Sequence, residues 1–206
     1  MCLRPPGQNG PRFWARFLTR KRKQMPVYIS MLRGVNVGSH NRIKMDALRK
    51  SVADLGCEQV QSYIQSGNVV FCAAKQPTRA LSKRMEECIL AEFGISVTVI
   101  TRTSYEMDAI IHNNPFLKER GADLSNLHIT FLSQSPDEAV LKKLAAANTA
   151  PDEFRHSGDV IYLHCVNRYS DTKLSNNFLE KTLAVRATTR NWTTVNKLRE
   201  MALECV

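Results

Sequence analysis

The sequence contains no long hydrophobic run. One of its longest apolar stretches, residues 69–74, is far shorter than the roughly 20 residues that a transmembrane helix needs. It also has no continuous apolar region behind its N-terminus, which argues against a secretory signal peptide. The hydrophobic content of 43% and the charged content of 23% are ordinary for a soluble protein. A chain of this length buries roughly 70% of its unfolded surface, so it can fold without disulfides or metals.

Cysteine and histidine motifs are missing as well. No two of the six cysteines have the C-x-x-C spacing, and neither they nor the five histidines show the spacing of zinc ligands. Cys72 and Cys165 lie within apolar strand patterns, where a free thiol packs as a small hydrophobe. We therefore predict reduced cysteines, a cytoplasmic location, no metal site and no cofactor.

Recognisable catalytic motifs are also absent. The sequence has no G-x-S-x-G, no H-E-x-x-H and no paired carboxylates, and it has neither a P-loop nor a dinucleotide-binding glycine pattern. An RNA-recognition sheet carries several stacking aromatics, whereas Phe71 and Tyr162 are single aromatics at strand ends. The sequence by itself therefore names no reaction.

Acidic residues are absent from residues 1–24, which contain seven arginines and lysines. The remaining residues carry 22 basic and 19 acidic side chains, so most of the net charge of +10 belongs to this extension. We predict a disordered basic extension, with a short amphipathic helix at its end as the alternative. Met25 is an alternative start of translation. Such an extension could bind nucleic acid, but it indicates no site on the folded part.

What the sequence does contain is a repeated hairpin. Residues 63–71 and 154–162 each have Ser-Gly, then Asn or Asp, two β-branched residues and an aromatic. Glycine and asparagine tolerate the positive φ of a tight turn, so each copy predicts two strands joined at that turn. We expect the two halves of the chain to superpose, with Ser66 matching Ser157 and Ile29 matching Ile129.

The periodicity around these hairpins predicts the same six elements twice, in the order β-α-β-β-α-β. The fold class that this order predicts is α+β, with two tandem ferredoxin-like subdomains. They occupy residues 25–112 and 127–206, are joined by a segment at 113–126, and the second is followed by a C-terminal helix. The predicted elements are strands at 27–32 and 95–101 and helices at 45–55, 81–93 and 105–111, then strands at 127–132 and 187–190 and helices at 139–147 and 178–183.

Three motifs together carry a resemblance: Arg-Gly-Val-Asn-Val-Gly at 33–38, Ser-Gly-Asn-Val-Val-Phe at 66–71 and Ala-Thr-Thr-Arg-Asn-Trp-Thr-Thr-Val at 187–195. In this order they resemble a mainly bacterial family known only as the domain of unknown function numbered 1697. The family often has a second glycine where this chain has Ser39. The resemblance begins at Met25 and implies a tandem α+β fold and a soluble bacterial protein. It implies no activity.

The first motif is a candidate anion site. It links a strand to a helix that begins near Ile43, and a helix N-terminus offers free N–H groups and the positive end of a dipole. The candidate ligand-binding residues are Arg33, Gly34, Asn36 and Gly38. In the alternative interpretation the glycines only turn the chain and Asn36 holds the loop together.

The third motif is a second candidate. Arg190 could bind a phosphate or carboxylate bidentately, with Trp192 as a stacking surface and Asn191 and Thr193 as polar neighbours. Lys173 is a further candidate at a helix start. In the alternative interpretation Thr193 caps the helix, Trp192 lies in the core and Arg190 bridges the two subdomains.

Topology limits how these residues can combine. In each unit the first two strands are parallel, so Ser66 and Asn68 should lie at the same end of the sheet as Arg33. Lys173 and Arg190 should share one end of the second sheet, and Arg33 can meet Arg190 only across the interface between units. The leading hypothesis is a binding protein for a small phosphate-bearing or other anionic ligand. The alternatives are a phosphate-transfer or hydrolytic enzyme and an RNA-binding protein.

Overall fold

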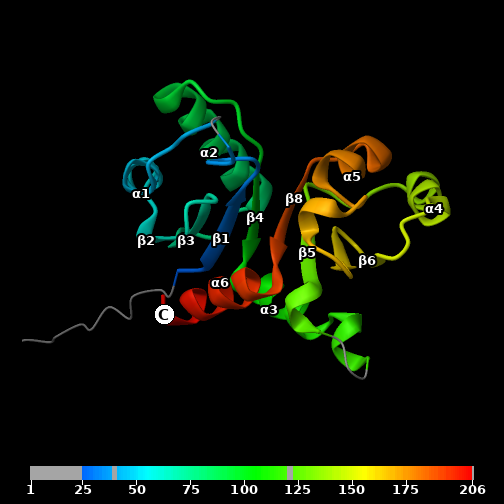
Figure 1. Cartoon of the computed structure of the whole chain (residues 1–206). Coiled ribbons are helices and arrows are strands. Elements are labelled where there is room, and N and C mark those ends of the chain that lie inside the picture. The colour runs from blue at the N-terminus through cyan, green and yellow to red at the C-terminus, as the bar shows by residue number, and fades with distance from the viewer. Residues whose placement is uncertain (1–24, 39–40, 120–122, 206) are drawn as a thin grey trace, which may run out of the picture.

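The computed structural model describes residues 25–38, 41–119 and 123–205. The predicted basic extension and Ser39 lie outside the described residues. The fold is α+β, with two four-stranded antiparallel sheets, six α-helices and three short 3-10 helices in the described residues (Figure 1). None of the described helices is both long and apolar enough to cross a membrane.

The first unit contains β1 Val27–Leu32, α1 Met45–Asp54, β2 Glu58–Tyr63, β3 Asn68–Cys72, α2 Thr78–Phe93 and β4 Val99–Thr103. A connecting segment follows, with α3 Ser104–His112, η1 Pro115–Lys118 and η2 Leu124–Asn126. The second unit contains β5 Leu127–Leu132, α4 Glu138–Ala146, β6 Glu153–Ser157, β7 Val160–His164, η3 Tyr169–Asp171, α5 Asn176–Leu183 and β8 Ala187–Asn191, and the helix α6 Trp192–Glu204 follows it.

The two sheets have matching topology. The strand order is β2-β3-β1-β4 in the first and β6-β7-β5-β8 in the second, and all neighbouring strands are antiparallel. The outer face of each sheet is covered by the helices of its own unit. Leu48 of α1 and Met85 of α2 pack against the first sheet, and Leu144 of α4 and Leu179 of α5 pack against the second.

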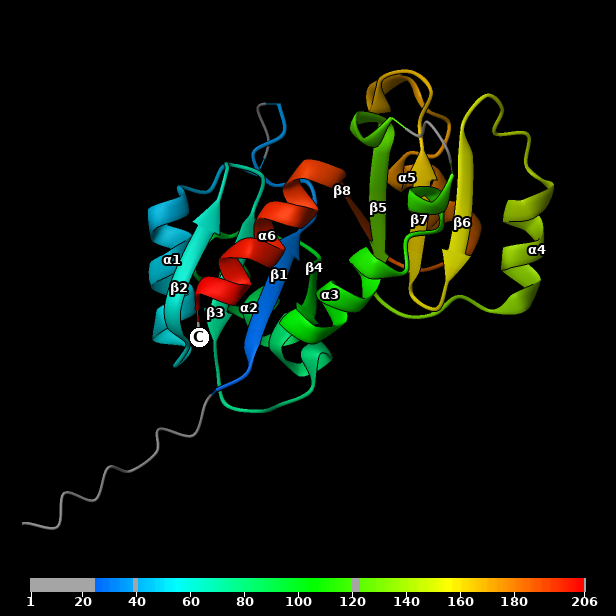
Figure 2. The ribbon, with the colours of Figure 1, turned by 90° about the horizontal axis from the view of Figure 1, so that it is seen from below.

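The inner faces of both sheets share a third core, because α6 and η1 each pack on the sheet of the other unit, while α3 packs on β1 and β4 of its own unit. The helix α6 follows the second unit but lies across β1 and β3 of the first sheet (Figure 2). In return, Phe116 of η1 packs near β7, and the Tyr162 hydroxyl donates to Ile110 O at 3.0 Å. Leu198 of α6, Ile29 and Tyr162 belong to one continuous cluster. The two units therefore form a single hydrophobic body.

The sequence repeat and the structural repeat differ by one residue at the hairpins. Ile29 pairs with Val70 in the first sheet, and its counterpart Ile129 pairs with Tyr162 in the second. The sequence repeat instead matches Tyr162 with Phe71. Because side chains alternate along a strand, this offset sends the matched aromatics to opposite faces. Phe71 packs in the outer core of the first unit, whereas Tyr162 packs in the shared core.

The cause is a difference in turn length. Tyr63 pairs with Asn68, which leaves four residues in the first turn, whereas Ser157 pairs with Val160, which leaves two in the second. The predicted match of Ser66 with Ser157 is therefore wrong by one residue, although both lie at hairpin ends as expected.

Several predicted boundaries shift by a few residues, and two of them matter for the site. The strand expected from Ile95 begins at Val99, after a stretch without regular structure. The last helix begins at Trp192, and its N-cap is Asn191, whose Oδ1 accepts from Thr194 N at 2.8 Å, so the predicted capping role of Thr193 is wrong. An asparagine is an equally good cap, and the helix therefore begins two residues earlier than a cap at Thr193 would allow.

Candidate functional site

Arg190 in β8 is buried, with 9% of its surface exposed, and all five of its N–H groups have protein acceptors. The acceptors in the first unit are Asn68 Oδ1 at 2.6 Å, Leu32 O at 2.8 Å and Ser66 O at 3.2 Å, and those in β8 are Thr188 Oγ1 at 2.8 Å and Thr189 O at 2.9 Å. The guanidinium therefore bridges the two units, as the structural interpretation of the sequence expects. A ligand beside Arg190 would be attracted by the positive charge of the guanidinium but would receive no hydrogen bond from it.

Arg102 in β4 is the counterpart of Arg190, since each pairs with the isoleucine in the middle of its unit's first strand. Arg102 Nη2 donates to Leu132 O at 2.8 Å, just as Arg190 Nη2 donates to Leu32 O. Each arginine thus reaches from the last strand of its own unit to the end of the first strand of the other. The interface between the units is clamped twice by the same kind of contact.

The two clamps differ in charge. Arg102 forms an ion pair of 2.8 Å with Asp159 in the hairpin of the second unit. The hairpin of the first unit offers Arg190 the neutral amide of Asn68 instead. No carboxylate among the described residues lies within ion-pair distance of Arg190. Burial lowers the pKa of Arg190 to about 10, which still leaves it charged at neutral pH.

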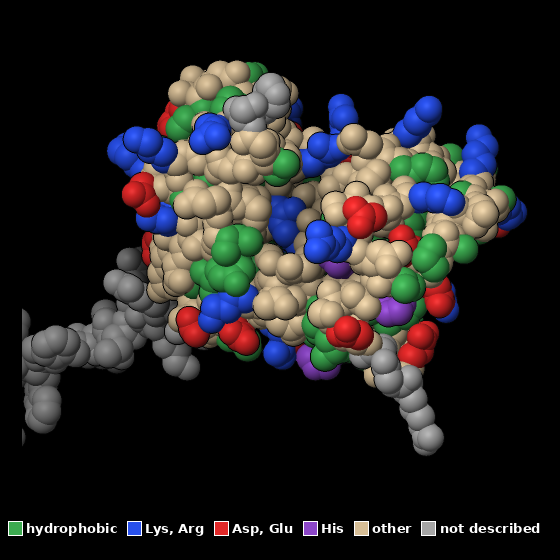
Figure 3. Space-filling view, viewed as in Figure 1, with side chains coloured by type: hydrophobic (Ala, Val, Ile, Leu, Met, Phe, Trp, Pro, Cys, Tyr) green, Lys and Arg blue, Asp and Glu red, His purple; other side chains and the backbone are tan. Residues whose placement is uncertain are grey.

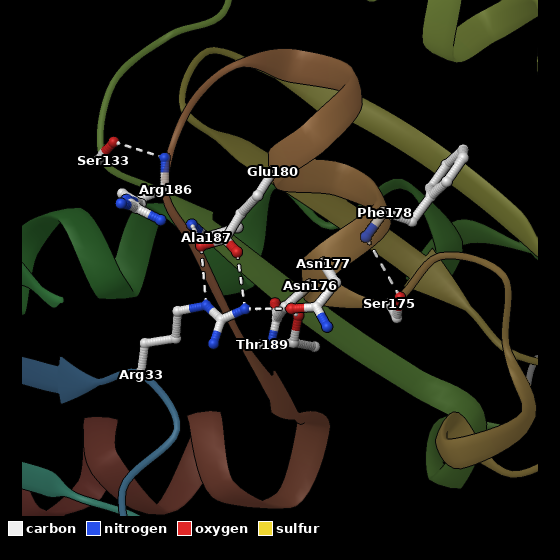
Figure 4. A network of polar contacts seen from close by, with 10 residues as sticks. All are labelled: Arg33, Ser133, Ser175, Asn176, Asn177, Phe178, Glu180, Arg186, Ala187 and Thr189. Carbon is white, nitrogen blue, oxygen red and sulfur yellow. Dashed lines mark hydrogen bonds and ion pairs between the residues drawn. The ribbon is translucent and has the colours of Figure 1, made fainter. Parts of the chain in front are cut away.

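Arg33 follows β1 and also crosses to the second unit (Figure 4). Its Nε and Nη2 donate to the two carboxylate oxygens of Glu180 in α5 at 2.8 and 2.7 Å, and Nη2 also donates to Asn177 Oδ1 at 2.5 Å. Glu180 Oε1 accepts in addition from Ala187 N at 3.0 Å. The charge of Arg33 is therefore matched by a carboxylate, in contrast to that of Arg190.

We expect Arg33→Gln to lower the free energy of unfolding by about 1–2 kcal/mol, because a half-buried bidentate ion pair is worth more than an exposed one. Urea unfolding followed by circular dichroism would measure the loss. Lys50→Gln, which removes an exposed ion pair with Asp54 in α1, is the matched control and should leave stability nearly unchanged. Equal effects in the two variants would contradict this ranking.

The loop after Arg33 is held by its own residues. Asn36 Nδ2 donates to Ile43 O at 2.9 Å and to Gln65 O at 2.7 Å, and Asn36 Oδ1 accepts from Ile43 N at 2.9 Å. Gly34 and Gly38 have φ of 66° and 63°, which glycine adopts without strain. These contacts tie the loop to the first hairpin, and they fit the interpretation in which Asn36 holds the loop.

A cleft of about 480 Å³ lies at the junction of the two units, with Arg190 in its lining. We call it the Arg190 cleft; its lining residues are 32–35, 37, 64, 66, 169, 175–177, 188–191 and 194. Arg33 and Arg190 are its two charged residues, and none of the lining residues is acidic. Figure 3 shows Lys and Arg side chains within the hollow between the units.

Further hydrogen-bond donors surround this cleft. The first turns of α5 and α6 both contribute to its lining, and a helix N-terminus favours negative charge. The Tyr169 hydroxyl is buried and makes no hydrogen bond of normal geometry in the described part of the chain, although the Thr189 side chain and the backbone of Asn176 lie close to it. Burial raises the pKa of Tyr169, so this hydroxyl stays protonated and able to donate. A buried donor without a well-formed hydrogen bond beside a cleft indicates a place for a bound water or ligand atom.

A second cleft, of about 630 Å³, occupies the corresponding position beside Arg102. Its lining also combines the last strand and helix of one unit with the hairpin of the other. It includes Glu86 and Asp159 besides three basic residues, so its charges are largely balanced. The Arg190 cleft differs from it in having no acidic residue in its lining.

The structure brings part of the predicted site together. The predicted residues that line the Arg190 cleft are Arg33, Gly34, Ser66, Arg190 and Asn191. Arg33 and Arg190 thus line one cleft from the two sides of the interface between the units, the only arrangement that the predicted topology allows for both in one site.

The other predicted residues lie elsewhere. Asn68 is fully buried against Arg190, and Asn36 and Gly38 line a small neighbouring cleft. Lys173 is exposed and donates to Asn148 O at 3.3 Å, outside the Arg190 cleft. Thr193 is not among the residues of that cleft.

Several residues in or beside the Arg190 cleft are missing from the set predicted from the sequence. Glu180, Tyr169 and Asn177 lie in the second unit, and no local motif marks them. Arg102 does have a signal, because Thr101-Arg102 aligns with Thr189-Arg190 when the two units are compared. Within the described residues, no cluster of three or more His, Cys, Asp or Glu side chains could hold a metal ion.

Comparison with known proteins identifies the family of this chain and a solved structure with a similar fold. A family model described as "Protein of unknown function (DUF1697)" matches residues 25–162, which is more than half of the sequence. The chain belongs to this family. A solved structure of similar fold is a conserved bacterial protein, SP0830, from Streptococcus pneumoniae. It is 24% identical, with a TM-score of 0.70, and the match covers 86% of this chain and 99% of that one. No curated protein matches the sequence significantly. The resemblance seen in the three sequence motifs is confirmed.

Proposed function

We propose that this protein binds a small anionic ligand, such as a phosphate ester or a carboxylate, and that the Arg190 cleft holds it. The observation that carries the proposal is the buried, charged Arg190 with no carboxylate partner among the described residues. Its hydrogen bonds are satisfied, but its net positive charge is left uncompensated beside a cleft without acidic side chains. An anion in the cleft would supply the missing counter-charge.

The charge of Arg190 would attract an anion more strongly than the nearby helix N-termini would. At a separation of about 6 Å and an effective dielectric constant of about 20, two unit charges attract by about 3 kcal/mol. A contact with one helix terminus contributes only about 0.3–1 kcal/mol. The first turns of α5 and α6 and the Tyr169 hydroxyl would then orient the anion, since Arg190 has no N–H group left to offer.

The lining of the cleft favours binding over catalysis. It contains no aspartate, glutamate, histidine, cysteine or lysine, so the hydroxyl groups of its serines, threonines and tyrosine have no usual general base among these residues to activate them. A volume of about 480 Å³ lies within the range of small-molecule sites. A cleft of this size, with only two basic residues in its lining, suits a small molecule better than the broad basic face that a nucleic acid requires.

We expect Asn68→Asp to weaken phosphate binding by about tenfold to a hundredfold, which corresponds to about 1.4–2.8 kcal/mol. The new carboxylate would take the place of the amide oxygen 2.6 Å from Arg190 Nε and neutralise the guanidinium internally. Isothermal titration with inorganic phosphate and phenyl phosphate would measure the affinity, and chemical-shift changes in the amides of β8 would locate the site.

Two controls accompany this variant. Asn148→Asp makes the same chemical change at an exposed position outside the cleft, and Asp159→Asn removes the carboxylate from the Arg102 clamp. Both should leave binding in the Arg190 cleft unchanged. If the wild type binds neither phosphate compound, or if Asn68→Asp binds as tightly as the wild type, the proposal fails.

We also infer that the two units are tandem ferredoxin-like subdomains, at residues 25–112 and 127–206, with the connecting segment between them. The shared order β-α-β-β-α-β and the antiparallel strand order β2-β3-β1-β4 support this assignment. The five cysteines in the described part of the chain are free, which supports a reducing compartment and hence a cytoplasmic location.

A further inference from the structure

The rim of the Arg190 cleft carries two exposed apolar side chains. Val37 is 67% exposed and Ile64 is 50% exposed, and both belong to the lining of the cleft. None of the other large exposed hydrophobic residues in the described part of the chain lines it. Single apolar residues on a surface are common, but a pair at the mouth of one polar cleft provides a second kind of surface for a ligand.

These two side chains are held in place by the loops that carry them. Val37 belongs to the loop after β1, and Ile64 belongs to the four-residue turn between β2 and β3. The side chain of Asn36 joins the two loops, since its Nδ2 donates to Gln65 O at 2.7 Å. The same amide group bonds the backbone of Ile43 in both directions, so the rim is fixed from the start of α1 to the hairpin.

Ile64 adopts an unfavourable backbone conformation in this position. Its φ is 49°, in the left-handed region, which a β-branched residue rarely enters because its side chain crowds the backbone. The second hairpin has a two-residue turn and holds Arg155 within a regular strand at the equivalent distance from its own Ser-Gly. Strain in an exposed isoleucine at a cleft is a feature of functional sites more than of stable turns.

We propose that the ligand of the Arg190 cleft is amphipathic: its anionic group lies towards Arg190, and an apolar portion covers Val37 and Ile64. This inference rests on the proposed function and specifies its ligand class. The charge of Arg190 selects the anionic end, and the rim binds the apolar end. Because the cleft measures about 480 Å³, the ligand is a free small molecule and not the surface of a lipid bilayer.

The test compares methyl phosphate with hexyl phosphate by isothermal titration. Both carry the same anionic group, and each methylene group that is fully buried strengthens binding about fourfold. We expect hexyl phosphate to bind at least tenfold more tightly than methyl phosphate. The gain is smaller than full burial would give, because the rim leaves part of the hexyl group in water. In Ile64→Ser and Val37→Ser this preference should fall to less than about threefold. Leu90→Ser, at an exposed leucine of α2 outside the cleft, should keep the full preference.

The outcomes separate this inference from the proposed function. If both phosphates bind equally well, the amphipathic ligand is excluded while anion binding stands. If neither binds, the proposed function itself fails. Co-sedimentation with vesicles that contain phosphatidic acid tests whether the partner is a membrane surface. Binding to vesicles without binding of hexyl phosphate would show a membrane surface as the partner and overturn the proposal.

Discussion

Arg190→Gln is expected to lower the free energy of unfolding by about 2–4 kcal/mol. The substitution leaves buried acceptors of the first unit without donors, and each such orphaned group costs about 1–3 kcal/mol, partly offset because a buried charge is removed. The acceptors that lose their partner are Asn68 Oδ1, Leu32 O and Ser66 O. Arg190→Lys should recover little of the loss, because one ammonium group cannot replace a planar group with five donors.

Urea unfolding would be followed by circular dichroism and by tryptophan fluorescence, since Trp192 packs against the shared core. Arg102→Gln is the matched variant in the other clamp, and it should also destabilise the protein. In the double variant we expect a larger loss than in either single variant, because both clamps between the units are then removed while the shared core remains. A loss below about 0.5 kcal/mol in Arg190→Gln would show that the clamp does not hold the interface.

Gly67→Ala is expected to destabilise the protein by about 2–4 kcal/mol. Gly67 has φ of 71°, which costs an alanine about 1–2 kcal/mol, and a Cβ there would lie 2.8 Å from Leu32 Cβ. Both atoms are Cβ atoms, which cannot move without the backbone, so one strand end has to shift. Such overpacking costs about 1–3 kcal/mol more. The strand end that moves is the one whose carbonyl accepts from Arg190.

Gly158→Ala provides the comparison for Gly67. Gly158 also has positive φ, at 60°, but a Cβ there would meet no atom within 4 Å. We expect Gly158→Ala to lower the free energy of unfolding only by the cost of placing an alanine at positive φ, about 1–2 kcal/mol. Thermal or urea unfolding of both variants would separate the two contributions. Equal losses would mean that the contact with Leu32 relaxes without energetic consequence.

Most helices and strands could be predicted from the sequence because their signals are local. The apolar spacing of α1 and the left-handed glycine at position 94, which ends α2, are properties of neighbouring residues. The one-residue offset between the hairpins could not be predicted in the same way. It depends on whether Ile64 enters the turn or the strand, and the repeated Ser-Gly is compatible with both.

The candidate site could be predicted only in part, because it is assembled from both units. The topology correctly places Arg33 and Arg190 on opposite sides of one interface. Which partner each arginine finds is a matter of packing between segments more than 100 residues apart in the sequence, such as Arg33 with Glu180 and Arg190 with Asn68. Whether a guanidinium is paired with a carboxylate or with an amide decides its role, and the sequence motifs contain no information on that choice.

The crossing of α6 onto the first sheet has a consequence for folding during synthesis. The strands of the first unit are complete at Thr103, but α6 begins only at Trp192. The helix α3 follows β4 directly and packs on β1 and β4, so it covers part of this inner face early. At a translation rate of about 5–20 residues per second, the part of the face that α6 covers, next to β3, stays open for on the order of 5–20 s. A chaperone therefore has time to bind this part of the nascent sheet before α6 is synthesised.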